Sequence, residues 1–304
     1  MGDIAALYLA NPLLFAASAF VVGLVVGSFL NVVIYRLPIM LEREWQGQAR
    51  ELLAAGTEPP SASAPAERFT LSHPRSACPT CKAPIKAWQN IPLLSWVLLN
   101  GRCAACSAKI SVRYPLVELL TGLLSAAVAW HFGFGIAAGC GLLITWSLIA
   151  LTGIDMDHQL LPDGITLPVM WLGLLAAVMI GPILGAPLPV SPFESVVGAA
   201  CGYLSLWLVY QAYRLITGKE GMGFGDFKLF ALLGAWLGYK LLPLIILLSA
   251  GTGAVLGIGM IVTRGRDRAA PMPFGPYLAS AGWIAMMWGN ELVNGYMRMS
   301  GLRR

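Results

Sequence analysis

The sequence predicts an all-α polytopic membrane protein with about eight transmembrane helices and one small cytoplasmic domain. Of its 304 residues, 57% are hydrophobic and only 12% are charged, whereas a soluble domain carries roughly 25% charged residues. Several apolar runs approach the roughly 20 residues that a helix needs to cross a bilayer. One long polar stretch holds two closely spaced cysteine pairs, which indicates a folded domain outside the membrane.

Eight apolar segments are candidates for the spans: 13–35, 115–131, 136–154, 165–185, 194–216, 227–239, 241–262 and 275–296. As a helix, the sixth would be only about 20 Å long, against a hydrocarbon core of about 30 Å. It is either a re-entrant segment or a short, tilted crossing. We favour the crossing, because a re-entrant segment would move the basic cluster Arg264–Arg268 to the other side of the membrane.

Lysines and arginines set the predicted orientation, because cytoplasmic loops of membrane proteins collect these residues. Ten of the twenty lie in 36–113, three in 214–228 and three in 263–274, against four on the opposite side. Both termini are therefore expected outside the cytoplasm. The net charge of +5 follows from this bias. We expect no nucleic-acid partner, since no basic helix carries base-reading side chains.

The chain is predicted to have three parts: a first transmembrane helix at 1–36, a cytoplasmic loop domain at 37–113 and a bundle of about seven transmembrane helices at 114–304. Within the loop domain, the pattern predicts a helix with a polar face at 40–55. A linker rich in proline, serine and alanine follows at 56–67. The four cysteines lie in 68–113, which we expect to be compact.

Glycine pairs four positions apart recur in the predicted spans. Small residues let helix backbones approach closely in lipid, so we interpret these pairs as packing sites and not as ligand sites. Cys140 and Cys201 also lie within spans and are interpreted as packing residues. The glycine pairs are Gly23/Gly27, Gly135/Gly139, Gly198/Gly202, Gly234/Gly238 and Gly253/Gly257.

Two Cys-x-x-Cys pairs, Cys78/Cys81 and Cys103/Cys106, indicate a metal site. Two such turns supply the four thiolates of a tetrahedral zinc site, although the spacer of 21 residues slightly exceeds the usual length. Disulfides are disfavoured in a cytoplasmic loop. A redox pair and four free cysteines explain the duplicated spacing less well. Four thiolates leave no open position, so we expect a structural Zn²⁺ in a small cytoplasmic zinc-binding domain.

Aspartates gather at the ends of two predicted spans. Asp155, Asp157 and Asp163 follow the third span, and Asp226 precedes the sixth after a glycine-rich segment. By the predicted topology, both places lie on the cytoplasmic side. Asp163 looks like the N-cap of the next helix, and capping is also an alternative for Asp226. Ionisable residues beside spans are functional candidates by default, so we expect Asp155 and Asp226 to meet.

Two carboxyl groups in a site of low dielectric constant can share one proton, which suits acid–base hydrolysis. One group then activates a water while the other donates to the scissile carbonyl oxygen. The sequence offers no competing nucleophile: it has no GxSxG or HExxH motif, and it has only three histidines. His158 is close to Asp155 in sequence and is expected to support the site at most.

Several motifs together resemble the type IV prepilin leader peptidases, the bifunctional peptidase/N-methyltransferases of bacterial inner membranes. The resemblance covers nearly the whole chain. Its two most specific parts are the GxGD aspartate and the segment in which Asp155 is followed by Pro162-Asp163. The matching segments are GSFLNVVIYRLP (27–38), the cysteine pairs, NIPLLSW (90–96), RYPLVEL (113–119), IDMDHQLLPD (154–163) and GKEGMGFGDFKLFALLGAWLG (218–238).

This resemblance implies a GxGD-type membrane aspartic protease with Asp155 and Asp226 as its catalytic pair and Asp157 as the alternative for the first position. It implies prepilins and type II secretion pseudopilins as substrates, cut at the cytoplasmic face of the inner membrane. It also implies methylation of the new N-terminus with S-adenosylmethionine, an activity for which the residues themselves give no glycine fingerprint. Its cysteines correspond to Cys78, Cys81, Cys103 and Cys106.

Two other classes of protein remain as alternatives. A transporter could use Asp155 and Asp226 as a proton or cation relay, although both carboxylates are expected at one face and not at mid-membrane. A non-enzymatic assembly scaffold with a zinc domain is the second alternative.

Overall fold

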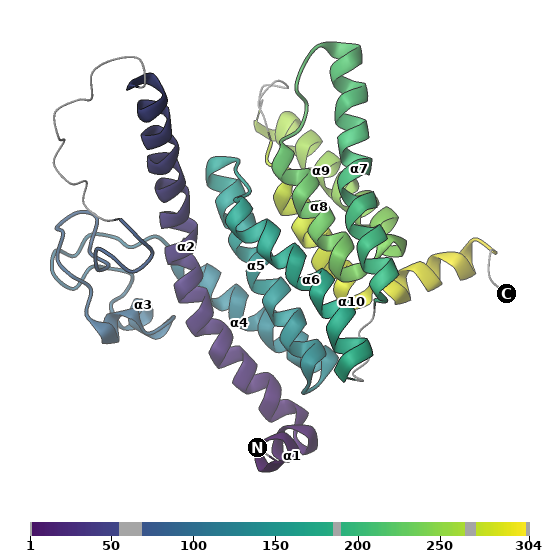
Figure 1. The fold of residues 1–304 in the computed structure, drawn as a ribbon. Helices are drawn as coiled ribbons and strands as arrows, with labels where there is room; N and C mark the ends of the chain where they lie inside the picture. Colours follow the sequence, from purple (N-terminus) through teal and green to yellow (C-terminus); the bar gives the residue numbers. More distant parts are fainter. Residues whose placement is uncertain (1, 55–68, 185–189, 265–271, 302–304) are drawn as a thin grey trace. The chain divides into compact units, whose positions relative to one another are not determined.

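The computed structural model describes residues 2–54, 69–184, 190–264 and 272–301, and these form helices without a strand (Figure 1). The prediction of an all-α membrane protein is confirmed. The only strand-like pairings in the described residues are the isolated bridges Ala77–Pro84 and Arg102–Lys109. The linker predicted at 56–67 lies outside the described residues.

The chain divides into two compact units, which are described separately. One unit comprises Leu13–Ala127, and the other comprises Met1–Pro12 with Val128–Arg304. The division falls within a continuous helix, α4 (Arg113–Phe132). The three parts that the sequence predicts, with boundaries after 36 and 113, stay a prediction.

Among the described residues, six helices are long and apolar enough to cross a membrane, judged by length and composition. They are α2 (Pro12–Ala54), α4, α5 (Ile136–His158), α6 (Asp163–Leu184), α7 (Pro192–Thr217) and α9 (Leu242–Arg264). The other two predicted spans are helices as well, α8 (Phe224–Leu237) and α10 (Gly275–Met299), so the predicted count of eight stays a prediction. Shorter elements are α1 (Gly2–Ala10), η1 (Ala87–Asn90), α3 (Leu94–Leu98) and η2 (Tyr239–Leu241).

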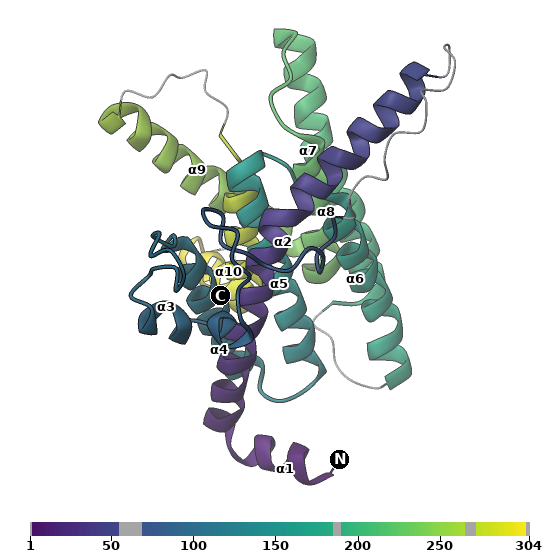
Figure 2. The ribbon, with the colours of Figure 1, turned by 90° about the vertical axis from the view of Figure 1, so that its left-hand side faces the viewer.

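Helix α2 dominates the Leu13–Ala127 unit and runs unbroken for 43 residues (Figure 2). At 1.5 Å per residue it is about 65 Å long, roughly twice the hydrocarbon thickness. The helix predicted at 40–55 is therefore the end of α2 and not a separate element. The helix continues through Pro38, which the sequence had placed at the start of the cytoplasmic loop.

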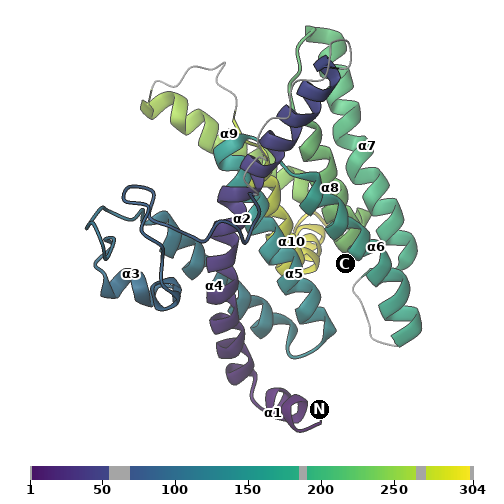
Figure 3. The same ribbon diagram turned by 60° about the vertical axis from the view of Figure 1, so that its left-hand side comes forward.

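Helix α8 is the centre of the Val128–Arg304 unit. Figures 1 and 3 show it beside α6 and α7, and it also contacts α9 and α10. A helix that is apolar on all sides is one that other helices enclose. Its 14 residues are too few to cross a bilayer of average thickness without tilting or local thinning. The side chains that are at most 2% exposed include Phe227, Leu229, Phe230, Leu232 and Leu233.

Glycines let α7 and α8 pack backbone against backbone. A Cβ built on Gly198 would stand 2.2 Å from the Gly234 carbonyl oxygen, and one on Gly202 would stand 2.5 Å from the Phe230 carbonyl oxygen. Nearby, the Ser195 hydroxyl donates to the Ala235 carbonyl oxygen at 2.6 Å. The packing role predicted for Gly198, Gly202 and Gly234 is confirmed.

Two other glycine pairs give opposite outcomes. Gly23 and Gly27 on α2 face α4 so closely that a Cβ on either would lie 2.6 to 2.8 Å from α4 atoms, which confirms their packing role. A Cβ built on Gly135 or Gly139 would meet no other helix within 4 Å among the described residues, so the packing prediction for that pair is wrong. The glycine pattern alone does not tell which helix faces are in contact.

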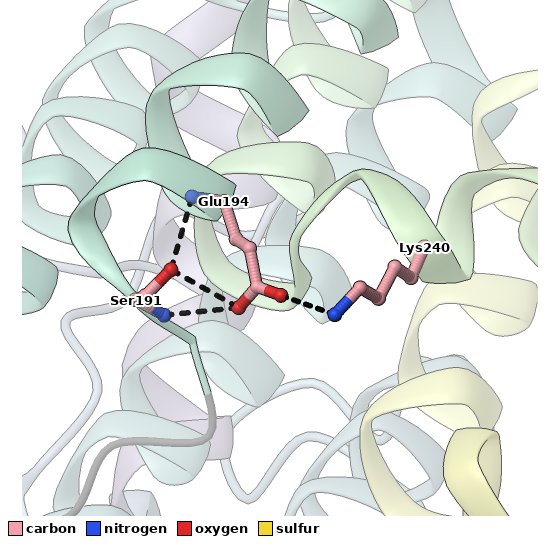
Figure 4. Close-up of polar contacts among 3 residues, drawn as sticks. All are labelled: Ser191, Glu194 and Lys240. Carbon is pink, nitrogen blue, oxygen red and sulfur yellow. Dashed lines mark hydrogen bonds and ion pairs between the residues drawn. The ribbon is translucent and has the colours of Figure 1, made fainter.

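The start of α7 is held by a capping box that extends into an ion pair (Figure 4). The Ser191 hydroxyl accepts from the Glu194 N–H at 3.2 Å, and the Glu194 carboxylate accepts from the Ser191 N–H at 3.2 Å. The same carboxylate accepts from Nζ of Lys240, in η2, at 2.5 Å. This contact ties the start of α7 to the segment that follows α8.

From the close backbone contact between α7 and α8, we predict how a substitution at Gly198 affects stability. Replacing Gly198 with alanine pushes the two helices apart and is expected to destabilise the protein by about 1–3 kcal/mol, the usual cost of overpacking. Gly139→Ala is the matched control, because it meets no neighbour and gains helix propensity. Thermal unfolding of the purified variants in detergent measures both. Equal melting temperatures for the two variants would rule out the close contact.

Candidate functional site

Asp155 lies at the end of α5, where its side chain is only 5% exposed. The helix ends at Gln159, which adopts the left-handed conformation and donates its N–H to the Asp155 carbonyl oxygen. The carboxylate atom Oδ2 accepts from the N–H of Gly275 at 3.0 Å. Because Gly275 is the first residue of α10, this carboxylate lies at the positive end of a helix dipole.

Any side chain at position 275 would force the Asp155 carboxylate to move. A Cβ built there would stand 2.6 Å from Asp155 Oδ2, far inside van der Waals contact. The missing side chain therefore allows the backbone N–H to reach the carboxylate. Sequence reasoning missed Gly275. The cluster of proline and glycine at 273–276, directly before an apolar helix, was the signal that could have found it.

Asp226 is the third residue of α8 and is 8% exposed. Its N–H donates to the carbonyl oxygen of Gly223, the N-cap residue, at 3.2 Å. Its carboxylate passes close to the same residue, since a Cβ on Gly223 would stand 3.7 Å from Asp226 Oδ2. A side chain at position 223 would therefore touch the carboxylate.

One leucine connects the surroundings of the two aspartates. Leu161, in the corner between α5 and α6, lies so close to Gly225 that a Cβ there would stand 2.7 Å from the leucine Cβ. The same side chain also lies beside Gly275, at 3.2 Å from a Cβ built there. Asp155 and Asp226 are therefore gathered around one corner of the bundle.

The other acidic candidates lie outside this pair. Asp157 and His158 are exposed, whereas Asp155 is buried. Asp163 is the first residue of α6 and not its N-cap, so the predicted capping role is wrong. Both of its carboxylate oxygens accept from Nζ of Lys228 at 2.7 Å. Sequence reasoning attached no role to Lys228, and its position two residues after Asp226 was the available signal.

The four cysteines of the two Cys-x-x-Cys pairs form a cluster in the Leu13–Ala127 unit, with all four sulfur atoms within 4.8 Å of one another. The sulfur atoms of Cys78 and Cys106 are 3.9 Å apart. Four sulfur ligands at about 2.3 Å from a tetrahedral ion lie about 3.8 Å from each other. The cluster therefore has the dimensions of a metal site.

The two cysteine pairs are presented by turns of the same design. The N–H of Cys78 donates to Ala83 and that of Cys103 to Ala108, at 2.9 and 2.8 Å. Lys82 and Ser107, each directly after the second cysteine of its pair, have φ angles of 60° and 57°. The repeated turn brings four sulfur atoms together although 21 residues separate the pairs.

Backbone donors prepare the first cysteine of each pair for metal binding. The N–H groups of Cys81 and Thr80 hydrogen-bond Cys78 and lower its pKa to about 6. The N–H groups of Cys106 and Ala105 likewise lower the pKa of Cys103. The thiolate is the form that binds metals, so these backbone donors favour the ligand state of the first cysteine in each pair, whereas the pKa of Cys106 is raised to about 11.

Buried polar contacts hold the segment 69–112, which carries the four cysteines, against the helices of its own unit. Arg36 on α2, only 8% exposed, donates to the carbonyl oxygens of Thr70 and Pro74 at 2.9 and 2.7 Å. Glu118 on α4 accepts from the Leu93 N–H at 2.8 Å. Buried charged side chains need such partners, so these contacts determine where the domain sits on α2 and α4.

Comparisons with known proteins agree over nearly the whole chain. The model of the bacterial peptidase A24 N-terminal domain matches residues 21–132, and that of the type IV leader peptidase family matches residues 142–258. A protein of Stutzerimonas stutzeri named prepilin leader peptidase/N-methyltransferase is 54% identical over 96% of this chain and 97% of its own length. No solved structure matches the chain.

Two further relatives carry the same name, prepilin leader peptidase/N-methyltransferase. The protein from Pseudomonas aeruginosa is 51% identical over 97% of this chain and 98% of its own length. The protein from Legionella pneumophila is 47% identical over 90% of this chain and 92% of its own length. With the two matched family models, these identities confirm the resemblance seen in the motifs: the chain belongs to the type IV leader peptidase family.

Proposed function

We propose that the protein is a membrane aspartic endopeptidase that removes the leader peptide of type IV prepilins, with Asp155 and Asp226 as its catalytic pair. The observation that carries this proposal is the burial of both carboxyl groups around the Leu161 corner. The names of the relatives support the substrate class. Neither transport nor scaffolding is favoured by relatives that bear a peptidase name.

The proposed reaction uses one carboxyl group as base and the other as acid. The ionised group takes a proton from a water, whose oxygen attacks the scissile carbonyl carbon. The protonated group donates to the carbonyl oxygen. The tetrahedral intermediate then expels the amine as the C–N bond breaks: the amine takes the proton that the base removed from water, and a hydroxyl of the intermediate returns its proton to the other carboxylate. Because the two groups act as a unit, their protonation belongs to the pair.

The surrounding backbone supports this chemistry. The Gly275 N–H holds Asp155 Oδ2 in place, so the carboxylate keeps one orientation. On the other side, a Cβ built on Gly223 has no neighbouring atom nearer than 3.7 Å, and at this glycine we expect an extended substrate peptide to approach Asp226. Asp157 is exposed whereas Asp155 is buried, so we assign the first catalytic position to Asp155.

We infer that Cys78, Cys81, Cys103 and Cys106 hold one structural Zn²⁺. We choose zinc among the metals because it binds four thiolates tetrahedrally and undergoes no redox chemistry. A closed set of four protein ligands leaves no position for substrate or water. The metal would therefore join the two cysteine turns and keep the domain folded.

The cellular setting is inferred from charge and from the family. The excess of lysine and arginine in 36–113 favours a cytoplasmic position for this segment, in a bacterial inner membrane whose lipid bilayer surrounds the apolar helices. The carboxylate pair then faces the cytoplasm. Type II secretion pseudopilins are the second substrate class that we propose.

The second half of the relatives' name supports methylation of the new N-terminus, with S-adenosylmethionine as the methyl donor. The described residues contain no strand, so none of them forms the strand–turn–helix unit that holds dinucleotides elsewhere. We therefore assign no residues to the methyl donor and derive no step for this transfer.

Substitution of either aspartate tests the catalytic pair. Asp155→Asn and Asp226→Asn each keep the shape of the side chain but remove the acid–base group, so leader cleavage is expected to fall about 10³-fold. Asp157→Asn is the matched control and is expected to cleave at the parent rate. Purified variants in detergent are mixed with a prepilin, and the shortened product is quantified. Cleavage at the parent rate by Asp155→Asn or Asp226→Asn would contradict the assignment of the catalytic pair.

Gly275→Ala tests the support of Asp155. The added methyl group would stand 2.6 Å from Oδ2 and must displace the carboxylate, and a displacement of about 1 Å costs about 100-fold in rate. Gly251→Ala, on α9, meets no neighbour and is the control. Cleavage rates and melting temperatures are measured together. An active Gly275→Ala protein is incompatible with the contact.

The cysteine cluster is expected to bind one zinc per chain. Elemental analysis of reduced protein, purified without chelator, should find one equivalent in the parent and less than about a tenth of that in Cys81→Ser, because thiolate loss opens the site. Cys201→Ser removes a cysteine outside the cluster and should keep the metal. Zinc-free parent protein that remains folded and active would exclude the structural role.

A further inference from the structure

We propose that the ion pair between Lys228 and Asp163 positions the first turn of α8, and with it Asp226, against the corner that follows Asp155. This inference rests on the proposed function, since it assigns positioning residues to the same carboxylate site. Nζ of Lys228 lies 2.7 Å from both carboxylate oxygens of Asp163. The contact joins residues that are 65 positions apart in the chain.

The two partners stand directly beside the two catalytic segments. Lys228 follows Asp226 by two residues on α8, and Asp163 ends the corner that begins after Asp155. Inside this corner, Leu161 already packs against Gly225. The ion pair and the leucine contact thus hold the same two segments together at two neighbouring points, one polar and one apolar.

Local helix stability does not explain a lysine at position 228. The residue is the fifth of α8, beyond its first turn, whereas the macrodipole favours cations only in the last turn of a helix. A residue that breaks a local rule is expected where function requires it. Asp163, by contrast, stands at the first position of α6, where a negative charge is favoured. The lysine is therefore placed for its partner on α6 and not for its own helix.

The exposure of the Lys228 and Asp163 side chains indicates that their ion pair positions a catalytic group and adds little to the stability of the fold. The side chains are 27% exposed for Lys228 and 55% exposed for Asp163, and ion pairs this exposed contribute little to stability. A shift of about 1 Å in a catalytic group, however, costs about 100-fold in rate. Loss of the pair should therefore lower kcat while the melting temperature and the KM stay near the parent values.

The protein carries a second ion pair that serves as control. Lys240 and Glu194 join η2 to the start of α7 through a similar contact at 2.5 Å (Figure 4). Neither residue adjoins Asp155 or Asp226 in the sequence or contacts them in the described residues. Lys240→Met removes a lysine from an ion pair as Lys228→Met does, but away from the carboxylate site.

The experiment is a double-mutant cycle on the full-length protein in detergent, with a purified prepilin as substrate. Lys228→Met and Asp163→Asn are each expected to lower the kcat of leader cleavage about 10- to 100-fold. The double variant should be no slower than the slower single variant, because both changes remove one interaction. Lys240→Met should keep the parent kcat.

Unchanged kcat in Lys228→Met, or losses that add in the double variant, would overturn the positioning role. Asp155→Asn and Asp226→Asn are assayed alongside. If these two are inactive while Lys228→Met is fully active, only the positioning role fails. If the asparagine variants still cleave, the proposed function fails and takes the positioning role with it.

Discussion

The constraint on which the rest of the protein depends is the burial of two carboxyl groups at the ends of apolar helices. Burying a charged group is costly unless partners compensate. Asp155 receives the Gly275 N–H at the start of α10, and Asp226 lies in the first turn of α8 beside the Gly223 backbone. Free backbone donors occur at the N-terminal ends of helices, and both carboxyl groups lie at such an end, Asp155 at the start of α10 and Asp226 in the first turn of α8.

Helix α8 determines where one of these groups lies. It is short, almost fully enclosed and packed on α7 through Gly198, Gly202 and Gly234. A helix held on all sides cannot shift without disturbing several contacts, so Asp226 keeps its depth and orientation. Lys228 and Leu161 add two contacts at the same end, one to Asp163 and one to the corner behind Gly225. Closely packed helices and these two contacts therefore surround the N-terminal end of α8, where Asp226 lies.

The sequence predicted the helical membrane fold, the cysteine cluster and the family, because each rests on a local pattern. Apolar runs predict the helices, and the Cys-x-x-Cys spacing predicts the turns that present the four cysteines, so neither prediction requires knowledge of the fold. The role of the aspartates is proposed on the same local motifs. The burial that separates Asp155 from Asp157 appears only in three dimensions.

Long-range contacts explain what the sequence did not predict. The bond from Gly275 to Asp155 joins residues 120 positions apart, and the ion pair of Lys228 with Asp163 joins residues 65 positions apart. No local pattern encodes such pairings. The capping role expected of Asp163 failed because α6 begins at this residue, and its carboxylate instead accepts from a lysine of another helix. The unbroken course of α2 through Pro38 likewise goes against a local rule about proline.

The most direct measurement is an experimental structure of the protein in lipid with a prepilin peptide whose scissile bond is replaced by a hydroxyl-bearing tetrahedral analogue. The account predicts that the hydroxyl lies within about 3.2 Å of a carboxylate oxygen from each of Asp155 and Asp226. A hydroxyl held by one aspartate alone, or a peptide bound away from the Leu161 corner, would contradict it.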